Sequence, residues 1–286
     1  MKNFLISLIW LSSLIIVSFY TYEHPEKIEL IKYYFNKVKA PEVELQKANF
    51  QKVLANSFSV EFSQVISLSE KTAFIVHDEN ILNFDPNTLK IYTQNGYLIQ
   101  HLKSKKLNLP KSFTRERNGG IKTVFIYNNN DYALISSSKT NCFYASIILL
   151  TNGRELFKTK CLTDSKKNTD FNGLGSSHIH HKNKIFLSIG APEQGSAKIR
   201  ILAQDFNSMF GKILEINKID LDKIAANQEN NLDLKIFTIG HRNPQGLTKI
   251  GDSFFSVEHG PKGGDELNKI IRDKNYGWPT VSYGTQ

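Results

Sequence analysis

The chain has 286 residues, enough for one large domain or two small ones at roughly 150 residues per domain. Hydrophobic residues make up 40% and charged residues 22%, a composition that excludes collagen, a coiled-coil rod and wholesale disorder. The net charge of +9 favours acidic ligands or anionic surfaces, but the lysines are spread along the whole chain. We therefore expect a solvated lysine-rich surface and no nucleic-acid partner.

The chain begins with an apolar segment at residues 4–20, which contains only serine and tyrosine hydroxyls as polar groups. A helix of about 17 residues is the lower limit for crossing a bilayer. The bulky residues that follow are unlike the small residues of a cleavage site, so we expect an uncleaved signal anchor over residues 1–24. Lys2 favours a cytoplasmic amino terminus, which leaves the rest on the periplasmic or other extracytoplasmic face. Secretion after cleavage is the alternative.

A helical pattern follows the anchor. Apolar residues recur at helical spacing between Ile28 and Val38, and Pro41 ends the pattern. The spacing predicts a helical stalk within residues 25–57.

From residue 58 onward, short β-branched and aromatic runs alternate with turn sequences. The turn signals are Asp-Pro-Asn at 85–87, Asn-Gly at 95–96 and 152–153, three asparagines at 128–130, Lys-Asn at 182–183 and Gly-Asp at 251–252. The pattern predicts an all-β domain over residues 58–286.

The hairpins of this domain open near Ile121, Ser177 and Gly246. Each interval is long enough for four short strands, as in a blade of a β-propeller, although a β-sandwich has the same kind of strands. The sequence of residues 220–229 predicts either a short helix or a loop insertion.

The two cysteines, Cys142 and Cys161, flank the Asn-Gly turn at 152–153. A hairpin folded at this turn places them nearly opposite each other, within reach of a disulfide that an oxidising compartment allows. Two reduced thiols are the alternative. A zinc site is disfavoured because the spacing is not that of paired zinc ligands.

Chemistry is concentrated in three blocks: GHRNPQGL at 240–247, EHGPKGGDELN at 258–268 and NYGWP at 275–279. In the first block, Arg242 offers a planar donor fork for a carboxylate. In the second, the Gly260-Pro261 step exposes backbone oxygens close to acidic side chains, which is an oxygen-rich setting suited to Ca²⁺.

In this order and at these short separations, the three blocks resemble the glucose/sorbosone dehydrogenase family. This family of soluble quinoproteins includes aldose sugar dehydrogenases that use pyrroloquinoline quinone (PQQ). The clear match covers residues 177–283, and the similarity before residue 118 is faint. The resemblance implies a six-bladed β-propeller of the quinoprotein glucose dehydrogenase type, incomplete in this chain, with about four blades. It also implies oxidation of an aldose at its anomeric carbon and delivery of electrons to an acceptor that the sequence does not name.

The resemblance also implies roles for particular residues. The tricarboxylate PQQ would be contacted by Arg242 and Asn243, and the ion that polarises its quinone would be held by main-chain carbonyls. The residues that match metal-site positions of the family are Gly260 and Pro261 at the PQQ-bound Ca²⁺, with Asp265 supporting its waters, and Glu266 and Tyr276 at a second Ca²⁺.

Two departures from the family weaken the prediction of an enzyme. Asn172 stands at the position of the catalytic base, and an amide cannot take a proton from a sugar hydroxyl. Asp170 or His178 could substitute for it. The chain also ends at Gln286, directly after the block that precedes further blades in the family. A non-catalytic propeller that binds carbohydrate or a protein partner is therefore the alternative function.

Overall fold

The structure is a computed structural model. It describes five short strands between residues 43 and 76, and it describes residues 90–284 with the exception of 102, 141, 163–168 and 194. The chain divides into two compact units, Met1–Glu42 and Val43–Gln286, and every described residue belongs to the second. The predicted anchor and the helical pattern before Pro41 lie outside the described residues. No helix in the described part has the length and apolar character needed to cross a membrane.

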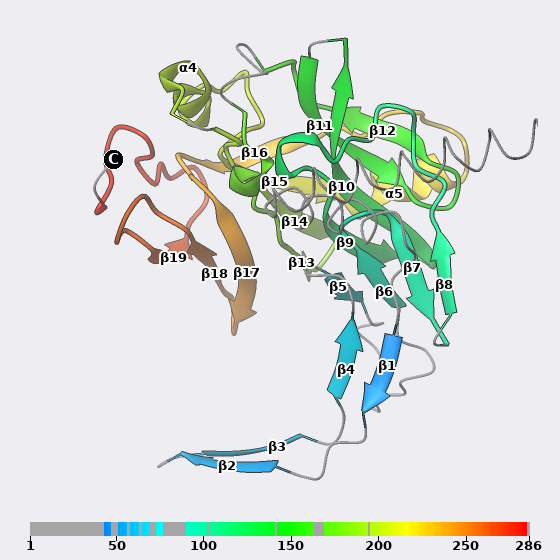
Figure 1. The fold of residues 1–286 in the computed structure, drawn as a ribbon. Coiled ribbons are helices and arrows are strands. Elements are labelled where there is room, and N and C mark those ends of the chain that lie inside the picture. The colour runs from blue at the N-terminus through cyan, green and yellow to red at the C-terminus, as the bar shows by residue number, and fades with distance from the viewer. Residues whose placement is uncertain are drawn as a thin grey trace, which may run out of the picture. The chain divides into compact units, whose positions relative to one another are not determined.

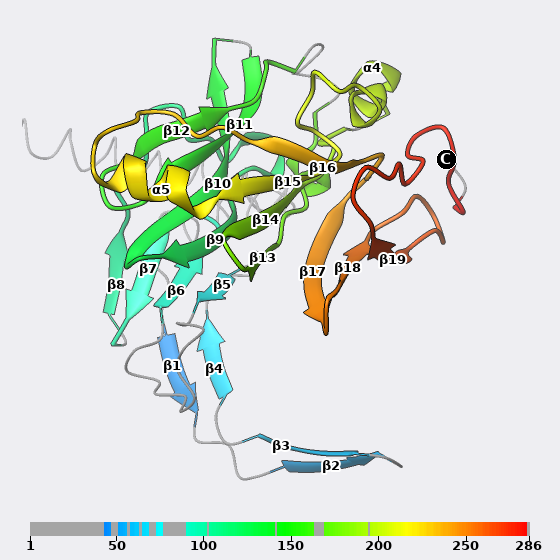
Figure 2. The ribbon, with the colours of Figure 1, turned by 180° about the vertical axis from the view of Figure 1, so that it is seen from behind.

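From residue 73 onward, the described residues form antiparallel sheets whose strands follow one another in chain order (Figures 1 and 2). The first sheet contains β5 (Ala73–Val76), β6 (Lys90–Thr93), β7 (Tyr97–Gln100) and β8 (Lys103–Lys106). The second contains β9 (Ile121–Tyr127), β10 (Asn130–Lys139), β11 (Cys142–Leu149) and β12 (Arg154–Lys158). The third contains β13 (His178–His181), β14 (Lys184–Ile189), β15 (Lys212–Asn217) and β16 (Lys235–Ile239). The fourth contains β17 (Pro244–Ile250), β18 (Ser253–Glu258) and β19 (Glu266–Ile270).

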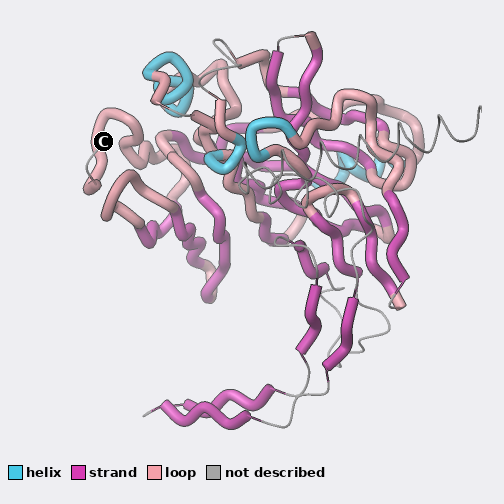
Figure 3. Tube along the Cα trace, viewed as in Figure 1, coloured by secondary structure: helices cyan, strands magenta, loops and turns pink. Residues whose placement is uncertain are grey.

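These meanders confirm the predicted all-β class, and strands dominate the described chain (Figure 3). Sheets of four antiparallel strands in chain order are the units of a propeller blade, whereas a sandwich is built from Greek-key connections. The predicted hairpin openings are also confirmed, because β9, β13 and β17 begin at Ile121, His178 and Pro244.

Two further hairpins precede the first sheet. Strand β1 (Val43–Gln46) pairs with β4 (Val65–Leu68), and β2 (Gln51–Ala55) pairs with β3 (Phe58–Phe62). Strands β1 and β2 fall inside residues 25–57, so the range predicted as a helical stalk is not helical throughout. Its second half alternates apolar and polar residues, as in the sequence VELQ of β1, and this period of two favours a strand.

Most of the predicted turns are formed by residues with a left-handed backbone. Asn128 and Asn129 have φ values of 46° and 58° at the β9–β10 turn, and Gly153 has a φ of 72° at the β11–β12 turn. Asparagine and glycine tolerate this conformation better than other residues. The local sequence therefore determines where each hairpin folds.

Each pair of neighbouring sheets shares a cluster of buried apolar residues. Tyr92 of β6 and Ile121 of β9 belong to the cluster between the first and second sheets. A larger cluster joins the second and third sheets and includes Phe125 and Leu187. Phe186 of β14 joins the cluster that the third sheet shares with β17 and β18 of the fourth. Burial of apolar area at these contacts holds the sheets in series.

The helices of the described part are short. Helix α4 (Ala197–Arg200) leads into the 3-10 turn η3 (Ile201–Ala203), and α5 (Lys218–Ala225) buries Leu221 and Ile224 against the sheets. Of the two predictions for residues 220–229, the short helix is correct for the first half of this range, up to Ala225. The remaining 3-10 turns, η1 (Glu116–Asn118) and η2 (Phe171–Gly173), lie in loops that build the site described below.

Cys142 and Cys161 form a disulfide, with their Cα atoms 5.5 Å apart. Strands β11 and β12 make the predicted hairpin, with Leu149 opposite Arg154. The prediction of a disulfide across the Asn-Gly turn is therefore confirmed, and no free cysteine remains among the described residues.

Candidate functional site

The loop that carries the GHRNPQGL sequence connects β16 to β17 and is fixed to two neighbouring loops by its backbone. The N–H of His241 donates to the carbonyl of Gly211 at 3.1 Å, and the carbonyl of Arg242 accepts from the N–H of Ala191 at 2.8 Å. These bonds hold the loop from the side of β14 and from the side of β15, so its side chains have a defined direction.

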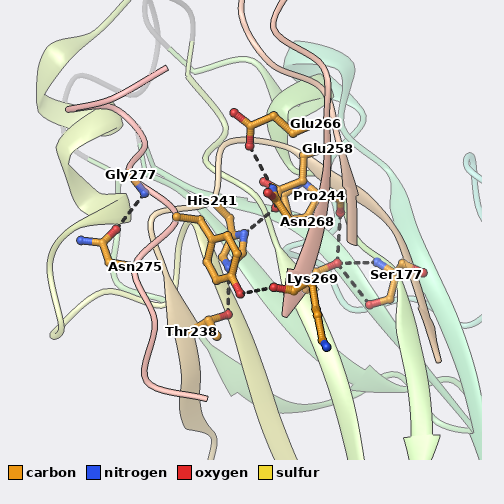
Figure 4. A network of polar contacts seen from close by, with 12 residues as sticks. Ser177, Thr238, His241, Pro244, Glu258, Glu266, Asn268, Lys269, Asn275 and Gly277 are labelled. Atoms are coloured by element: carbon orange, nitrogen blue, oxygen red, sulfur yellow. Dashed lines mark hydrogen bonds and ion pairs between the residues drawn. The ribbon is translucent and has the colours of Figure 1, made fainter. Parts of the chain in front are cut away.

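Beneath this loop lies a buried polar network (Figure 4). The Nδ1 atom of His241 lies 2.6 Å from Oε1 of Glu258, and its Nε2 atom lies 2.8 Å from the hydroxyl of Thr238. The ring of Tyr276 stacks on the imidazole with the two centroids 4.6 Å apart. His241 is fully buried and Glu258 is 3% exposed, so the pair is shielded from solvent. Their contact ties the first chemical block to the second.

Opposing effects act on the carboxyl of Glu258. Burial works to raise its pKa, but the imidazole of His241 and the amide of Asn268 stabilise the carboxylate. The N–H of Arg242 adds a backbone hydrogen bond. The stabilising contacts outweigh burial, and the pKa of Glu258 lies below its ordinary value of 4.5.

Arg242 joins the first block to the main chain of the second. Its Nη1 donates to the carbonyls of His259 and Gly260, each at 3.0 Å, and its guanidinium lies over the ring of Trp278 at 5.2 Å. Its Nε atom is buried and has no hydrogen-bond partner among the described residues. A buried donor without a partner is costly, so this side chain is suited to an anionic ligand that would accept from it.

A tight turn presents the carbonyls next to Arg242. The carboxylate of Asp265 accepts from the N–H of Gly260 at 3.1 Å and lies 3.3 Å from Nδ1 of His259. The carbonyl of Pro261 accepts from the N–H of Gly264 at 2.8 Å. Asp265 is therefore a residue that shapes the turn.

The structure brings the predicted metal residues together. Glu266 accepts from the amide of Asn268 at 2.9 Å, and the hydroxyl of Tyr276 donates to the carbonyl of Lys269 at 2.6 Å. A small pocket of about 10 Å³ lies among these elements. The predicted metal and cofactor residues that line it are Gly260, Pro261, Glu266, Tyr276 and Arg242, together with Glu258, His259 and Trp278.

The donors around this pocket suit Ca²⁺, because carboxylate and main-chain oxygens are the ligands that calcium prefers. No cluster of three or more His, Cys, Asp or Glu side chains in the described residues is arranged to hold a metal ion. A calcium ion here would depend on carbonyls such as those of Gly260 and Pro261. The Gly260 carbonyl already accepts from Arg242, so a cation that uses this oxygen would displace the guanidinium from it.

A second, larger pocket of about 270 Å³ lies beside the same loop. We call it the Lys122 pocket, and its lining residues are Gln94, Ile121, Lys122, Asn172, Leu174, Gly175, Ser176 and Gln245. None of these lining residues is a carboxylate, and the side chains of Gln94, Asn172 and Gln245 are neutral amides. Such a lining can donate to and accept from the hydroxyls of a sugar.

Two loops next to the lining residues Lys122 and Asn172 are cross-linked. Arg117 donates from Nε to the carbonyl of Thr169 at 3.0 Å, and the amide of Asn118 donates to Asp170 at 3.0 Å. The carboxylate of Asp170 also caps η2 by accepting from the N–H of Asn172 at 2.9 Å. Asp170 therefore holds the loops together, and Asn172 is directed to the pocket.

Close packing at Gly175 links the Lys122 pocket to the GHRNPQGL loop. A Cβ atom on Gly175 would lie 2.2 Å from Oδ1 of Asn243, so only glycine fits there. Asn243 is buried, and its Oδ1 atom accepts from Nε2 of Gln245 at 3.4 Å. Arg242 thus directs its side chain to the carbonyl turn, while Gln245, three residues later, lines the Lys122 pocket.

Lys122 is the cationic residue that lines this pocket. Its Nζ donates to the carbonyl of Asn118 at 2.9 Å. Burial lowers the pKa of Lys122 to about 8; the carboxylate of Asp170 opposes this effect, and the guanidinium of Arg115 adds to it. The lysine is therefore half-protonated near pH 8, and about a tenth of it is the neutral amine at pH 7.

His178 lies elsewhere. It belongs to β13, packs against Phe125 with ring centroids 5.7 Å apart, and has Nδ1 3.4 Å from the hydroxyl of Thr123. Burial, with a smaller effect from His180, lowers its pKa to about 4. It does not line either pocket described above, so the structure does not bring this predicted catalytic candidate to the site.

Sequence reasoning missed the His241–Glu258 pair and the role of Lys122. A histidine and a glutamate 17 residues apart carry no local signal of contact. Lys122 did carry a signal, because it is a charged residue in the apolar run IKTVFIY of β9. Interpreting that signal required knowing that Asn172 faces the same pocket.

The fold is similar to that of two solved structures. The crystal structure of the soluble aldose sugar dehydrogenase from Escherichia coli in the apo-form superposes with a TM-score of 0.55 at 24% identity, over 71% of this chain and 62% of that chain. A second solved structure, a glucose dehydrogenase, gives a TM-score of 0.55 at 23% identity, over 74% of this chain and 68% of that one.

The family model described as Glucose / Sorbosone dehydrogenase matches residues 83–286, and the chain belongs to this family. Aldose sugar dehydrogenase YliI of Escherichia coli is 33% identical over 109 residues, which are 36% of this chain and 28% of that protein. Quinoprotein glucose dehydrogenase B of Acinetobacter calcoaceticus is 38% identical over 83 residues, 28% of this chain and 17% of that protein. The matches thus span less than a third of these relatives' length.

Proposed function

We propose that this protein oxidises an aldose sugar at its anomeric carbon, with PQQ and Ca²⁺ as cofactors. Family membership supports the reaction class, since two relatives are named as sugar dehydrogenases and one of them as a quinoprotein. We further propose that the meanders described above belong to a six-bladed propeller. The similarity of fold to two sugar dehydrogenases supports this.

The observation that carries the proposal is the position of Arg242. Its guanidinium lies beside the carbonyls of His259 and Gly260, and its Nε is buried and has no hydrogen-bond partner in the part of the chain that the structure describes. A tricarboxylate needs such a cation, and a calcium ion needs such carbonyls. Anion and metal ligands would therefore meet at one place.

The residues of the chain have separate tasks in this proposal. Arg242 would bind and orient the anionic cofactor, and the carbonyls of Gly260 and Pro261 would hold Ca²⁺ in the turn shaped by Asp265. Bound PQQ would supply a quinone that accepts the hydride of the sugar and, with it, two electrons. The amides of Asn172 and Gln245 would position the sugar hydroxyls.

Equilibrium titration with PQQ and Ca²⁺, followed by tryptophan fluorescence, tests the proposal directly. Arg242→Gln removes the charge, and we expect it to weaken PQQ affinity about 10- to 100-fold, as for loss of one charge-assisted hydrogen bond. The matched control is Arg154→Gln, because Arg154 contacts Asn227 and Ile224 and lies in neither pocket. Equal PQQ affinity in both variants, or no binding to the unmodified protein, would reject the proposal.

A second candidate function follows from Asn172. An amide at the position of the family's base favours a propeller that binds carbohydrate or a protein partner without turnover. This alternative predicts sugar or cofactor binding without dye reduction, and sustained reduction of a dye with any aldose would eliminate it.

We also propose that the domain faces the extracytoplasmic space, attached by an amino-terminal anchor. The apolar segment at residues 4–20 and the Cys142–Cys161 disulfide support this location. Membrane fractionation before and after carbonate washing, with protease access to intact spheroplasts, would test both the attachment and the side of the membrane.

A further inference from the structure

Oxidation of a sugar hydroxyl requires a group that takes its proton. Three candidates for this group are excluded by their chemistry or by the contacts that they make. Asn172 lines the pocket but is a neutral amide. Asp170 has its carboxylate engaged by Asn118 and by the N–H of Asn172, and it does not line the pocket. His178 is packed between β13 and β9.

We propose that the side-chain amine of Lys122 is the proton acceptor of this site, supplied from the neighbouring sheet in place of the base absent at Asn172. This inference rests on the proposed sugar oxidation. The proton of the anomeric hydroxyl passes to Nζ, the O–H and C–H bonds break, and a C=O bond forms. The hydride with its electron pair passes to the quinone oxidant, and the amine becomes an ammonium.

The contacts of Lys122 allow this role. Its Nζ has a main-chain carbonyl, that of Asn118, as its hydrogen-bond partner, and this carbonyl is also 3.4 Å from Nε2 of Gln94. A carbonyl accepts a hydrogen bond from either the ammonium or the amine, so the partner does not fix the charge. No carboxylate lines the pocket to hold the lysine permanently charged.

The backbone that presents this carbonyl is held in an uncommon conformation. Arg117 and Asn118 have φ values of 55° and 60°, in the left-handed region that residues other than glycine rarely adopt. The contacts of Arg117 with Thr169 and of Asn118 with Asp170 stabilise it. The strained loop therefore aims the Asn118 carbonyl at Lys122 and fixes the amine at the wall that also carries Asn172.

The electrostatic surroundings make the amine available near neutral pH. The charged groups that act on Lys122 are Asp170, which favours the ammonium, and Arg115, which disfavours it, and burial adds to the effect of Arg115. With the pKa of Lys122 at about 8, the fraction of neutral amine rises from about a tenth at pH 7 to about nine tenths at pH 9. Turnover should rise over the same interval, above the range of a histidine with an ordinary pKa of about 6.5.

The premise can be measured without turnover by competitive acetylation of the full chain. Acetic anhydride reacts with neutral amines, and mass spectrometry of peptides reports each lysine separately. We expect half-maximal labelling of Lys122 near pH 8. A midpoint for Lys122 at the ordinary lysine value of 10.5 would overturn the inference.

The catalytic role is tested by three variants in a dye-reduction assay, with PQQ affinity measured on the same samples. Lys122→Ala and Lys122→Arg should both reduce kcat/KM by about 10²- to 10⁴-fold, because arginine retains the cation but cannot accept a proton at these pH values. Ethylamine should restore part of the rate of Lys122→Ala. Lys105→Arg is the control and should match the unmodified protein.

The outcomes separate this inference from the proposed function. A Lys122→Arg variant that retains a tenth or more of the rate would show that charge, and not proton transfer, is what Lys122 contributes, and it would overturn the inference. If the unmodified protein bound PQQ and Ca²⁺ but oxidised no aldose, the inference about Lys122 would also be overturned, while the proposed cofactor binding would stand. Failure of the unmodified protein to bind PQQ would reject the proposed function itself, and the inference with it.

Discussion

Removal of the buried carboxylate of Glu258 should be far more damaging than removal of its neighbour Glu266. The two residues lie directly opposite each other on β18 and β19, and both accept from the amide of Asn268. Glu258 is 3% exposed and also pairs with the fully buried His241, whereas Glu266 is half-buried and lacks the second contact. Glu266→Ala is therefore a matched control for Glu258→Ala.

The expected magnitude follows from what each change leaves behind. In Glu258→Ala, a fully buried imidazole loses its 2.6 Å partner, and breaking a buried pair from one side costs about 3–5 kcal/mol. In a unit of roughly 200 residues this lowers Tm by roughly 6–20 °C. Glu266→Ala leaves Asn268 bonded to Glu258, so its cost should stay within about 1 kcal/mol.

Urea unfolding followed by circular dichroism, without added calcium, measures both variants against the unmodified protein. The slope of the unfolding free energy against urea should be unchanged, because the sheets that unfold are the same. If Glu258→Ala and Glu266→Ala had the same unfolding free energy within error, the His241–Glu258 pair would not be the contact that joins the two loops.

Three further predictions concern pH, the disulfide and packing at the site. The folded-state pKa of Glu258 is below 4.5, so the unfolded chain binds a proton at this carboxylate more readily than the folded chain does. The contribution of the Glu258 carboxylate to stability is therefore present above pH 4.5 and is lost as the pH falls through the lower folded-state pKa. Glu258→Gln should flatten this part of a curve of unfolding free energy against pH, measured by urea unfolding. Reduction of the Cys142–Cys161 disulfide, whose cysteines are 19 residues apart, should lower the free energy of unfolding by about 3 kcal/mol in a urea titration. A reductant should have no effect on the variant with serine at both positions in the same urea titration. Gly175→Ala should force Asn243 to move and lower the free energy of unfolding by about 1–3 kcal/mol, measured by calorimetry. The control Gly251→Asn should change this free energy little, because the space around Gly251 is open and asparagine tolerates its φ of 57°.

Much of the fold was predictable because its signals are local. Asparagine and glycine at the hairpin turns adopt the left-handed backbone by themselves, as at Asn128, Asn129 and Gly153, so the positions of the hairpins follow from neighbouring residues. The disulfide was predictable for the same reason, since the hairpin between β11 and β12 places its two cysteines across one turn. The extent of the helical stalk was not predictable, because a short strand such as VELQ needs a partner strand to form. Its partner β4 begins at Val65, and 18 residues separate it from the end of β1 at Gln46.

The sequence by itself determined the family, the all-β class and the chemical character of the blocks that contain Arg242 and Gly260, because these depend on residue types at fixed spacing along the chain. Only the tertiary structure decided which groups share a site. Packing of the second and third sheets places Lys122 in one pocket with Asn172, 50 residues later, and buries it enough to lower its pKa. Packing of the third and fourth sheets likewise encloses the His241–Glu258 pair. Burial and contact between distant segments arise only when the sheets assemble, so no pattern in the local sequence records them.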